Sequence, residues 1–317
     1  MRLFVFFLLS IPTVLLGQDY PSKPIRLIVA TAPGGLMDVA ARSLADHFER
    51  AFGQRVLVEN RGGGGGVLAG DAVAKAPPDG YTLAQIQVGN VAINPFLVKD
   101  MPFDPLVDFA AVAPLTSSPV VVAVSSRLGV QNLNEFIQTA KREPGKLNYG
   151  SAGVGTIPHF AGELFSQAAG VKLTAVHYRG AGPALTDLLA GQVQAIFVGL
   201  GVVKTHMAAG TVKVLAVSQG KRLAAAPEIP TAAEAGLPGF DLVTWFGIVA
   251  PRGTPEKVIS LLNRQVHAMQ DDPVVLKRFA DSGLEALKES PDQFAARWRR
   301  DHAKYRELIR AAGLKPE

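Results

Sequence analysis

Short apolar runs alternate along the chain with stretches in which apolar residues recur at helical spacing. The run at 24–30 is bounded by proline and glycine, as buried strands commonly are, and it leads through a glycine turn into a helical pattern that begins at Val39. Runs at 55–59 and 81–88 repeat this order of strand, glycine turn and helix. The alternation predicts an α/β fold with a mainly parallel, doubly wound sheet.

A second block of strand and helix patterns follows a polar break. It opens with a strand run at 117–126. Further strand runs are predicted at 146–150, 171–178, 193–199 and 212–218. The glycine turn at 151–156 leads into a helix expected from about Pro158 to Ala168. This block therefore predicts a second sheet with its own helices.

After one more strand run at 241–251 the pattern is almost wholly helical, with Pro255, Pro273 and Pro291 near three helix starts, where the missing N–H costs nothing. A helical tail without a new sheet must pack on an existing one. We therefore expect the chain to cross between two lobes near residues 121 and 244, through a hinge of two strands. The first lobe comprises residues 18–121 and 245–317, and the second lobe comprises residues 122–244.

The N-terminus has the pattern of an export signal. Arg2 supplies a positive charge, and residues 3–16 carry none. This stretch is shorter than the roughly 20 apolar residues that a membrane helix needs, but it suits the core of a secretory signal. We expect residues 1–17 to be a cleaved signal peptide and the mature chain to be periplasmic; an uncleaved anchor is the alternative.

Composition narrows the chemistry. The chain has 317 residues, of which 48% are hydrophobic and 19% charged, as in a globular protein of two domains. It has no cysteine, which excludes disulfides, thiol nucleophiles and thiolate zinc sites. The net charge of +5 is modest, and the basic segment 297–310 has the spacing of an amphipathic helix. We therefore expect no nucleic-acid partner.

Glycine turns at the ends of predicted strands are the candidate binding elements. Such a turn before a helix exposes backbone N–H groups and the positive end of the helix dipole, which favour an anion. One turn contains Pro33, Gly34 and Gly35; the other contains Ser151, Gly153, Gly155 and Thr156. Because ligands of open α/β sheets lie beyond the carboxyl ends of strands, two lobes facing each other would aim both turns into one cleft. Each could also be no more than a tight turn.

Three side chains near these turns have two interpretations each. Asp38 could cap the following helix or contact a ligand amine or hydroxyl. His159 could donate to a ligand or make a local packing or capping contact. Arg179 ends a predicted strand and could pair with a carboxylate or face solvent.

Several catalytic and cofactor motifs are absent or incomplete. The segment Gly64–Ala69 fits G-x-G-x-x-A, but the next strand has Gln85 and Gln87 where a dinucleotide fold needs an acid. Tyr149 stands where the nucleophile elbow around Ser151 needs glycine. No pair of histidines has metal-ligand spacing. We expect no catalysis, no cofactor and no metal.

Many motifs in one order resemble the substrate-binding proteins of tripartite tricarboxylate transporters, also called the Bug family. They include APGGLMDVAAR (32–42), PPDGYTL, AINP, YGSAGVGTIPHFAGELF, YRGAGPALTDLLAGQV and WFGIVAPRGTP. This resemblance implies a two-lobed fold of the periplasmic-binding-protein type II and a solute receptor that delivers a small carboxylate to a membrane permease of a large and a small subunit. It implies no catalysis, and we expect a monomer.

The resemblance also places the ligand site by matching motifs. The implied ligand-binding residues are Pro33, Gly34, Gly35, Leu36, Asp38, Gly89, Asn90, Ser151, Gly155, Thr156, His159 and Gly199. Backbone amides are expected to dominate binding, and Asp38 and Thr156 to modulate specificity. Gly89, Asn90 and Val91 depart from the small hydroxyl or histidine residues that the family often has before AINP, which leaves the far end of the ligand open.

Two other functions remain as alternatives. A nicotinamide-dependent oxidoreductase would use the turn at Gly64–Ala69 and would respond to NADH. The effector-binding domain of a transcription regulator would share the two-lobed architecture but needs a DNA-binding segment, and the N-terminus offers only the signal.

Overall fold

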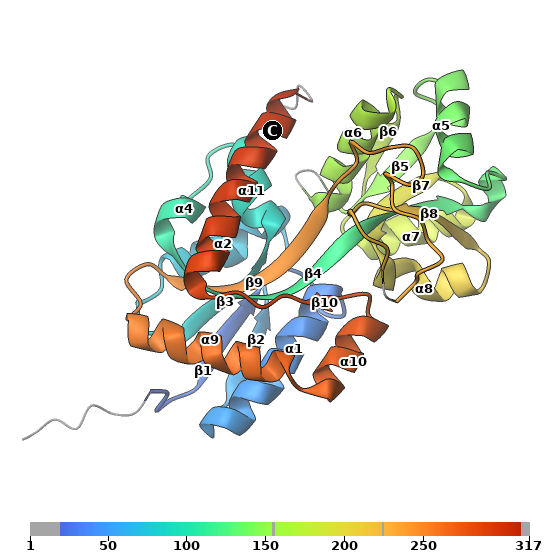
Figure 1. Ribbon diagram of the computed structural model, residues 1–317. Coiled ribbons are helices and arrows are strands. Elements are labelled where there is room, and N and C mark those ends of the chain that lie inside the picture. The colour runs from blue at the N-terminus through green and yellow to red at the C-terminus, as the bar shows by residue number, and fades with distance from the viewer. Residues whose placement is uncertain (1–19, 154–155, 224, 312–317) are drawn as a thin grey trace, which may run out of the picture.

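The computed structural model describes residues 20–153, 156–223 and 225–311 (Figure 1). The predicted signal peptide, residues 1–17, lies outside the described residues. The strands are β1 (Ile25–Val29), β2 (Val56–Asn60), β3 (Thr82–Gln87), β4 (Phe109–Ser125), β5 (Asn148–Ser151), β6 (Thr174–His177), β7 (Ala195–Gly199), β8 (Val212–Val217), β9 (Val243–Pro251) and β10 (Glu285–Ala286). The α-helices are α1 (Leu36–Phe52), α2 (Val67–Ala74), α3 (Asn94–Leu97), α4 (Pro105–Asp108), α5 (Leu133–Arg142), α6 (Ile157–Ala169), α7 (Ala181–Ala190), α8 (Leu200–Ala208), α9 (Glu256–Gln270), α10 (Pro273–Asp281) and α11 (Pro291–Ala311).

Three predicted strand–turn–helix units build the first lobe. Strand β1 lies between β2 and β3, and both pairings are parallel. Helix α1 follows β1 and buries Met37, Leu44 and Phe48, and Gly53 ends it in the left-handed conformation, donating to the carbonyl of Glu49. Helix α1 contacts α9 and α10, whereas α2 packs on β3 (Figure 1). The α/β prediction is confirmed here.

The centre of the sheet is antiparallel, so the prediction of a mainly parallel sheet is wrong there. Strand β9 runs antiparallel to β3 and to β4. The 17-residue strand β4 begins at Phe109, well before the predicted run at 117–126. Pro114 lies at a register shift, where a missing N–H is tolerated, and Pro119 is the last residue paired with β9. Of these two prolines, only Pro114 lies in the first part of the strand, which the sequence pattern did not predict.

Strand β4 belongs to both lobes. Its residues up to Pro119 pair with β9, and from Val120 onwards it pairs with β7 on one edge and, from Val121, with β8. Strands β7, β5 and β6 follow in that order, with both further pairings parallel. Helix α8 leaves the end of β7, a helix that the sequence pattern did not indicate. The two central strands are thus the physical connection between the lobes.

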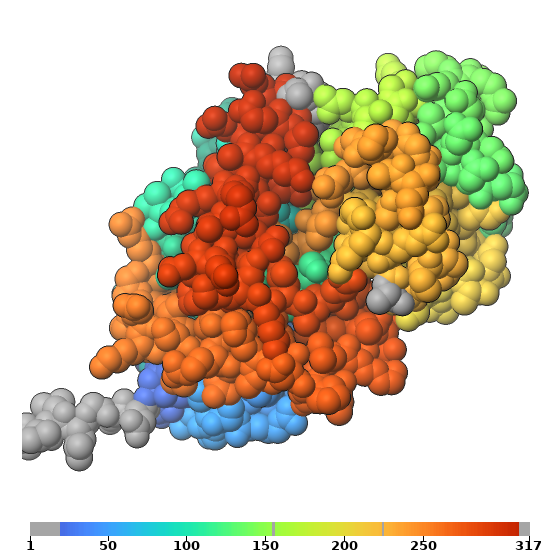
Figure 2. Space-filling model, in the orientation of Figure 1, coloured from blue at the N-terminus to red at the C-terminus, as the bar shows by residue number. Residues whose placement is uncertain are grey.

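The helical tail packs on the central strands. Helices α9, α10 and α11 begin beside the three predicted prolines. Helix α11 buries Phe294, Trp298, Tyr305 and Ile309, the residues that recur at helical spacing. Figure 2 shows α11 and the segment near residues 220–240 on opposite sides of a surface hollow in which atoms of the central strands are visible.

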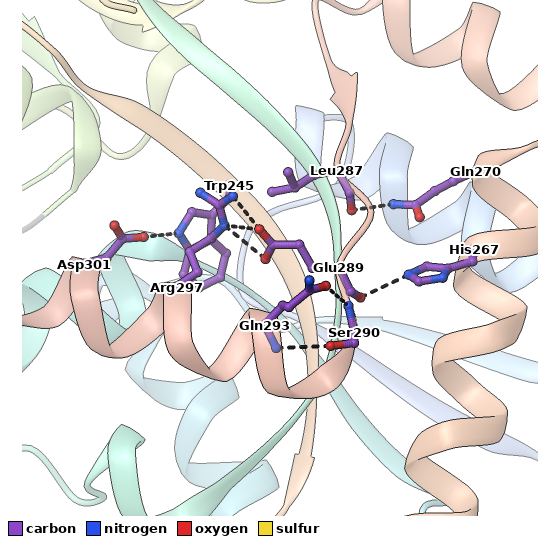
Figure 3. A network of polar contacts seen from close by, with 9 residues as sticks. All are labelled: Trp245, His267, Gln270, Leu287, Glu289, Ser290, Gln293, Arg297 and Asp301. Atoms are coloured by element: carbon purple, nitrogen blue, oxygen red, sulfur yellow. Dashed lines mark hydrogen bonds and ion pairs between the residues drawn. The ribbon is translucent and has the colours of Figure 1, made fainter.

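A polar network fastens the start of α11 to the strands and to α9 (Figure 3). Glu289 receives two hydrogen bonds from Nε of Arg297 and one from its guanidinium Nη2, and the indole N–H of Trp245 on β9 donates to Asp301 at 2.7 Å. The side-chain amide of Gln270 donates to three carbonyls, those of Pro114, Leu115 and Leu287. Burial raises the pKa of the Asp301 carboxyl, against the opposing effects of the Trp245 hydrogen bond and nearby cations. The network therefore links α9 and α11 to the central strands β4 and β9.

Candidate functional site

The first turn joins β1 to α1 and is organised by Asp38. Gly34 adopts φ +85°, and Gly35 is the residue before the helix. The Asp38 carboxylate accepts from the Gly34 N–H at 3.0 Å, from Arg42 Nε at 2.9 Å and from Asn60 Nδ2 at 3.0 Å. Both carboxylate oxygens are therefore engaged within the protein. The charge of Asp38 therefore shapes the turn that precedes α1, and the contact of Asp38 with a ligand stays a prediction.

The protonation of Asp38 follows from these contacts. Burial alone would raise the pKa of its carboxyl, but hydrogen bonds from Arg42, Gly34 and Asn60 outweigh burial and hold this pKa below its ordinary range. The side chain is only 7% exposed. The Asp38 carboxylate thus stays ionised at physiological pH, paired with the Arg42 guanidinium.

The second turn joins β5 to α6 and is held by hydroxyl groups. The Ser151 side chain is completely buried and accepts from the Gly153 N–H at 3.3 Å. The Thr156 hydroxyl donates to the Gly153 carbonyl at 2.6 Å and makes no capping bond to the helix. Gly155 lies outside the described residues. The Ser151 and Thr156 hydroxyls therefore bond to the backbone of the turn itself, directly before α6 begins.

A histidine that the sequence analysis missed completes this turn. His177, the last residue of β6, lies with Nδ1 2.7 Å from the Ser151 hydroxyl oxygen. Its ring meets the ring of His159 edge-on, with centroids 4.8 Å apart. The sequence signal for His177 is its position near the carboxyl end of a predicted strand. Arg179, two residues further on, is exposed.

Beneath the His159 backbone lies a buried tyrosine. The Tyr149 hydroxyl is 3.1 Å from the His159 carbonyl and 2.7 Å from Glu163 Oε1. Burial, reinforced by Glu163, raises the pKa of the Tyr149 phenol, so this group stays a neutral donor. Tyr149 thus ties the first turn of α6 to β5.

The third segment is a π-helical turn at Gly89–Ile93, after β3. Asn90 Oδ1 accepts from the Gln87 N–H at 2.9 Å, and Asn90 Nδ2 donates to the Gly65 carbonyl, as does Asn94 Nδ2 at 2.9 Å. A Cβ at Gly66 would collide with the Asn90 amide. The glycine run therefore closes on the side chains of Asn90 and Asn94.

Two contacts join segments of the two lobes. An ideal Cβ at Gly199 would lie 2.9 Å from Leu36 Cδ1 and 2.7 Å from the Ser118 hydroxyl, and one at Gly89 would lie 3.8 Å from Ile157 Cγ1. Leu36 opens α1 and Ile157 opens α6. The start of α1 thus lies against the end of β7, beside Ser118 of β4, which no sequence signal indicated, and the start of α6 lies against the turn after β3. That these segments share one ligand remains a prediction.

Neither a candidate metal cluster nor a membrane-spanning helix is found among the described residues. Within residues 20–153, 156–223 and 225–311, no group of three or more acids and histidines could hold a metal ion. No helix in these ranges combines the length and the apolar character needed to cross a bilayer.

The sequence profile of the tripartite tricarboxylate transporter family receptors matches residues 40–314. The chain belongs to this receptor family. BugT of Bordetella pertussis is 35% identical over 278 residues, covering 87% of this chain and 85% of BugT. A UPF0065 protein of Bordetella bronchiseptica is 35% identical over 312 residues, covering 98% of this chain and 92% of that protein.

Solved structures of receptors superpose on the whole fold. The R. palustris protein Rpa4515 with adipate gives a TM-score of 0.89 at 33% identity, over 94% of this receptor and 100% of that chain. MatC from Rhodopseudomonas palustris with bound malate gives 0.85 at 31% identity, over 92% and 100%. The periplasmic binding protein BugD gives 0.86 at 31% identity, over 94% and 100%. The receptor therefore has the two-lobed periplasmic-binding-protein fold that the family resemblance implied.

Proposed function

We propose that this chain is an exported periplasmic receptor that binds a small carboxylate between its lobes and delivers it to a membrane transporter with a large and a small subunit. We keep the lobes at residues 18–121 with 245–317 and at 122–244, the signal peptide at 1–17, and a monomeric state as parts of this proposal. It includes no catalytic role.

The observation that carries the proposal is that each of two helix starts lies against the end of a strand in the other lobe. Helices α1 and α6 have 17 and 13 residues; the start of α1 lies against Gly199 after β7, and the start of α6 lies against Gly89 after β3. Helix N-termini concentrate free N–H groups and positive potential, so two of them directed at one space favour an anion. Two similar structures, one with adipate and one with bound malate, support a carboxylate as that anion.

The oxidoreductase alternative has less support. A dinucleotide turn needs its glycine backbone open to a pyrophosphate. In this chain the Gly65 carbonyl accepts from Asn90 and Asn94, and Gly66 is packed against the Asn90 amide. The glycine run therefore serves the packing of the π-helical turn.

A melting-temperature screen of the mature chain tests the proposal. The probes are adipate, malate, citrate, benzoate and glutamate, with NADH as the probe of the alternative. A ligand at 100 times its dissociation constant adds about 2.7 kcal/mol to the free energy of unfolding, which a thermal scan resolves. Stabilisation by at least one carboxylate and none by NADH is expected. Stabilisation by NADH alone would overturn the proposal.

A further inference from the structure

Three hydroxyl groups lie buried on the two strands that connect the lobes. Ser118 of β4 pairs with Thr244 of β9, and Thr116 lies two residues before Ser118, so the three side chains share one face of the sheet. Thr116 and Ser118 are completely buried, and Thr244 is 7% exposed. Within the described part of the chain, none of the three hydroxyl oxygens has a hydrogen-bond partner. A buried hydroxyl without a partner has lost its bonds to water, so it destabilises the arrangement that buries it.

The cover over Ser118 comes from a contact between the lobes. An ideal Cβ at Gly199 would lie 2.7 Å from the Ser118 hydroxyl oxygen and 2.9 Å from Leu36 Cδ1, and one at Gly201 would lie 3.0 Å from Leu36 Cδ2. The Leu36 side chain, at the start of α1 in the first lobe, thus packs on the start of α8 in the second lobe. A rotation that separates Leu36 from α8 therefore opens the junction at which Ser118 lies.

The lobes are closed onto each other in the described arrangement. The rings of Phe160 on α6 and Tyr305 on α11 meet edge-on with centroids 5.3 Å apart, and both side chains are buried. Lys204 of α8 donates to the Asp281 carbonyl at the end of α10 at 3.3 Å. Two helix pairs, each with one helix from either lobe, are therefore in contact. We call this state the closed arrangement.

We propose that the hydroxyls of Thr116, Ser118 and Thr244 bias the ligand-free receptor toward a more open arrangement, so that closure depends on a ligand that bridges the lobes. The ligand part of this inference rests on the proposed function. Because Ser118 is completely buried, it offers no surface to a ligand in the closed arrangement. If the ligand is held tightly only by the closed receptor, the apparent dissociation constant is the intrinsic one divided by the closed fraction. The hydroxyls thus lower affinity without touching the ligand.

The first experiment needs no ligand. The chain has no cysteine, so Leu68→Cys on α2 and Gln138→Cys on α5, both at exposed positions, take a donor and an acceptor fluorophore. Single-molecule energy transfer then compares the labelled mature chain with and without Ser118→Ala and Thr244→Val. Removing both hydroxyls should shift the ligand-free distribution toward the one that saturating adipate or malate produces. Identical ligand-free distributions would overturn the inference.

The second experiment measures affinity by calorimetry with adipate and malate. The double variant Ser118→Ala/Thr244→Val should bind about tenfold more tightly than the unmodified chain, because an apolar side chain is buried without the loss of bonds to water. Unchanged binding would overturn the inference, and so would weaker binding, which would show that the hydroxyls support the ligand-bound state. If the double variant fails to fold, Ser118→Ala alone is measured.

Ser125→Ala is the matched control. Ser125 is the last residue of β4, is 2% exposed, and its hydroxyl also has no partner among the described residues, but it pairs with Val212 within the second lobe. This variant should keep the affinity and the energy-transfer distribution of the unmodified chain. An equal shift in Ser125→Ala would refute the role of the lobe junction. If no carboxylate binds the unmodified chain, the proposed function fails, and the ligand-free distributions still decide whether the hydroxyls favour opening.

Discussion

The turn at 33–38 and the turn at 151–156 hold equivalent places, because each joins the carboxyl end of a strand to a helix start, yet different groups organise them. In the first, the Asp38 carboxylate accepts three hydrogen bonds, and its lowered pKa keeps it charged. In the second, the Ser151 and Thr156 hydroxyls and the His177 imidazole do this work.

This difference bears on how firmly each turn is held. A turn held by an ionised carboxylate keeps one charge over the physiological pH range, and hydrogen bonds to a charged group are stronger than those between neutral groups. The second turn relies on hydroxyl hydrogen bonds. We therefore expect the first turn to be held more firmly than the second.

Asp38→Ala should have the largest effect on this comparison. It leaves the Gly34 N–H and the Asn60 amide without their partner, at about 3 kcal/mol in the free energy of unfolding, and it loosens the first turn. Urea unfolding and calorimetry measure the two consequences. Asp38→Asn, which keeps the shape and part of the bonding, should cost less. Equal stability of Asp38→Ala and the unmodified chain would show that the turn does not depend on this carboxylate.

Gly199→Val tests the junction of the lobes. Its side chain would enter the space between Leu36 and Ser118, and overpacking of this kind costs about 2 kcal/mol. If this cost falls on the ligand-bound arrangement of the lobes, carboxylate affinity should drop about 30-fold. Gly220→Val is the matched control, since a Cβ there meets nothing within 4 Å. A Gly199→Val protein with wild-type affinity would argue against a ligand site at this junction.

Thr156→Ala should weaken the second turn by one hydrogen bond, its 2.6 Å bond to the Gly153 carbonyl. The expected loss is about 1 kcal/mol, which corresponds to about fivefold in affinity. Thr156→Ser restores the hydroxyl and should bind within about twofold of the unmodified chain. If the alanine and serine variants bind equally well, the hydroxyl does not organise the turn.

The smallest effect is the acid dependence of the first turn. Because the folded-state pKa of Asp38 is lowered, its contribution to stability is present above the ordinary value of 3.8 and is lost as the pH falls through the folded-state pKa. The stability difference between the unmodified chain and Asp38→Asn should thus be constant from pH 8 to 5 and shrink below about pH 4. A difference that changes between pH 8 and 5 would contradict this.

Local pattern sufficed for much of this fold, and long-range pairing explains what it missed. The helix starts at Pro255, Pro273 and Pro291 and the units around β1, β2 and β3 follow from periodicity and turn residues. The first part of β4 did not, because Pro114 interrupts its pattern and lies at a register shift with β9.

The candidate site shows the same limit. Glycine turns at strand ends could be found in the sequence. The engagement of Asp38 with Asn60 and of Ser151 with His177, 22 and 26 residues away, depends on neighbouring strands that bring their ends together. Ser118, which pairs with Thr244 of β9, lies beside Gly199 because β4 pairs with β7 from Val120 onwards.

Because a single strand, β4, is hydrogen-bonded in both lobes, the lobes cannot slide past each other without breaking its pairings. Bending or twisting near Pro119 and Val120 is the relative motion that those pairings leave intact. Ligand occupancy would then translate into one angular coordinate. A fluorophore pair placed on exposed residues of α2 and α5 would follow that coordinate optically, which makes the chain a natural scaffold for a carboxylate biosensor.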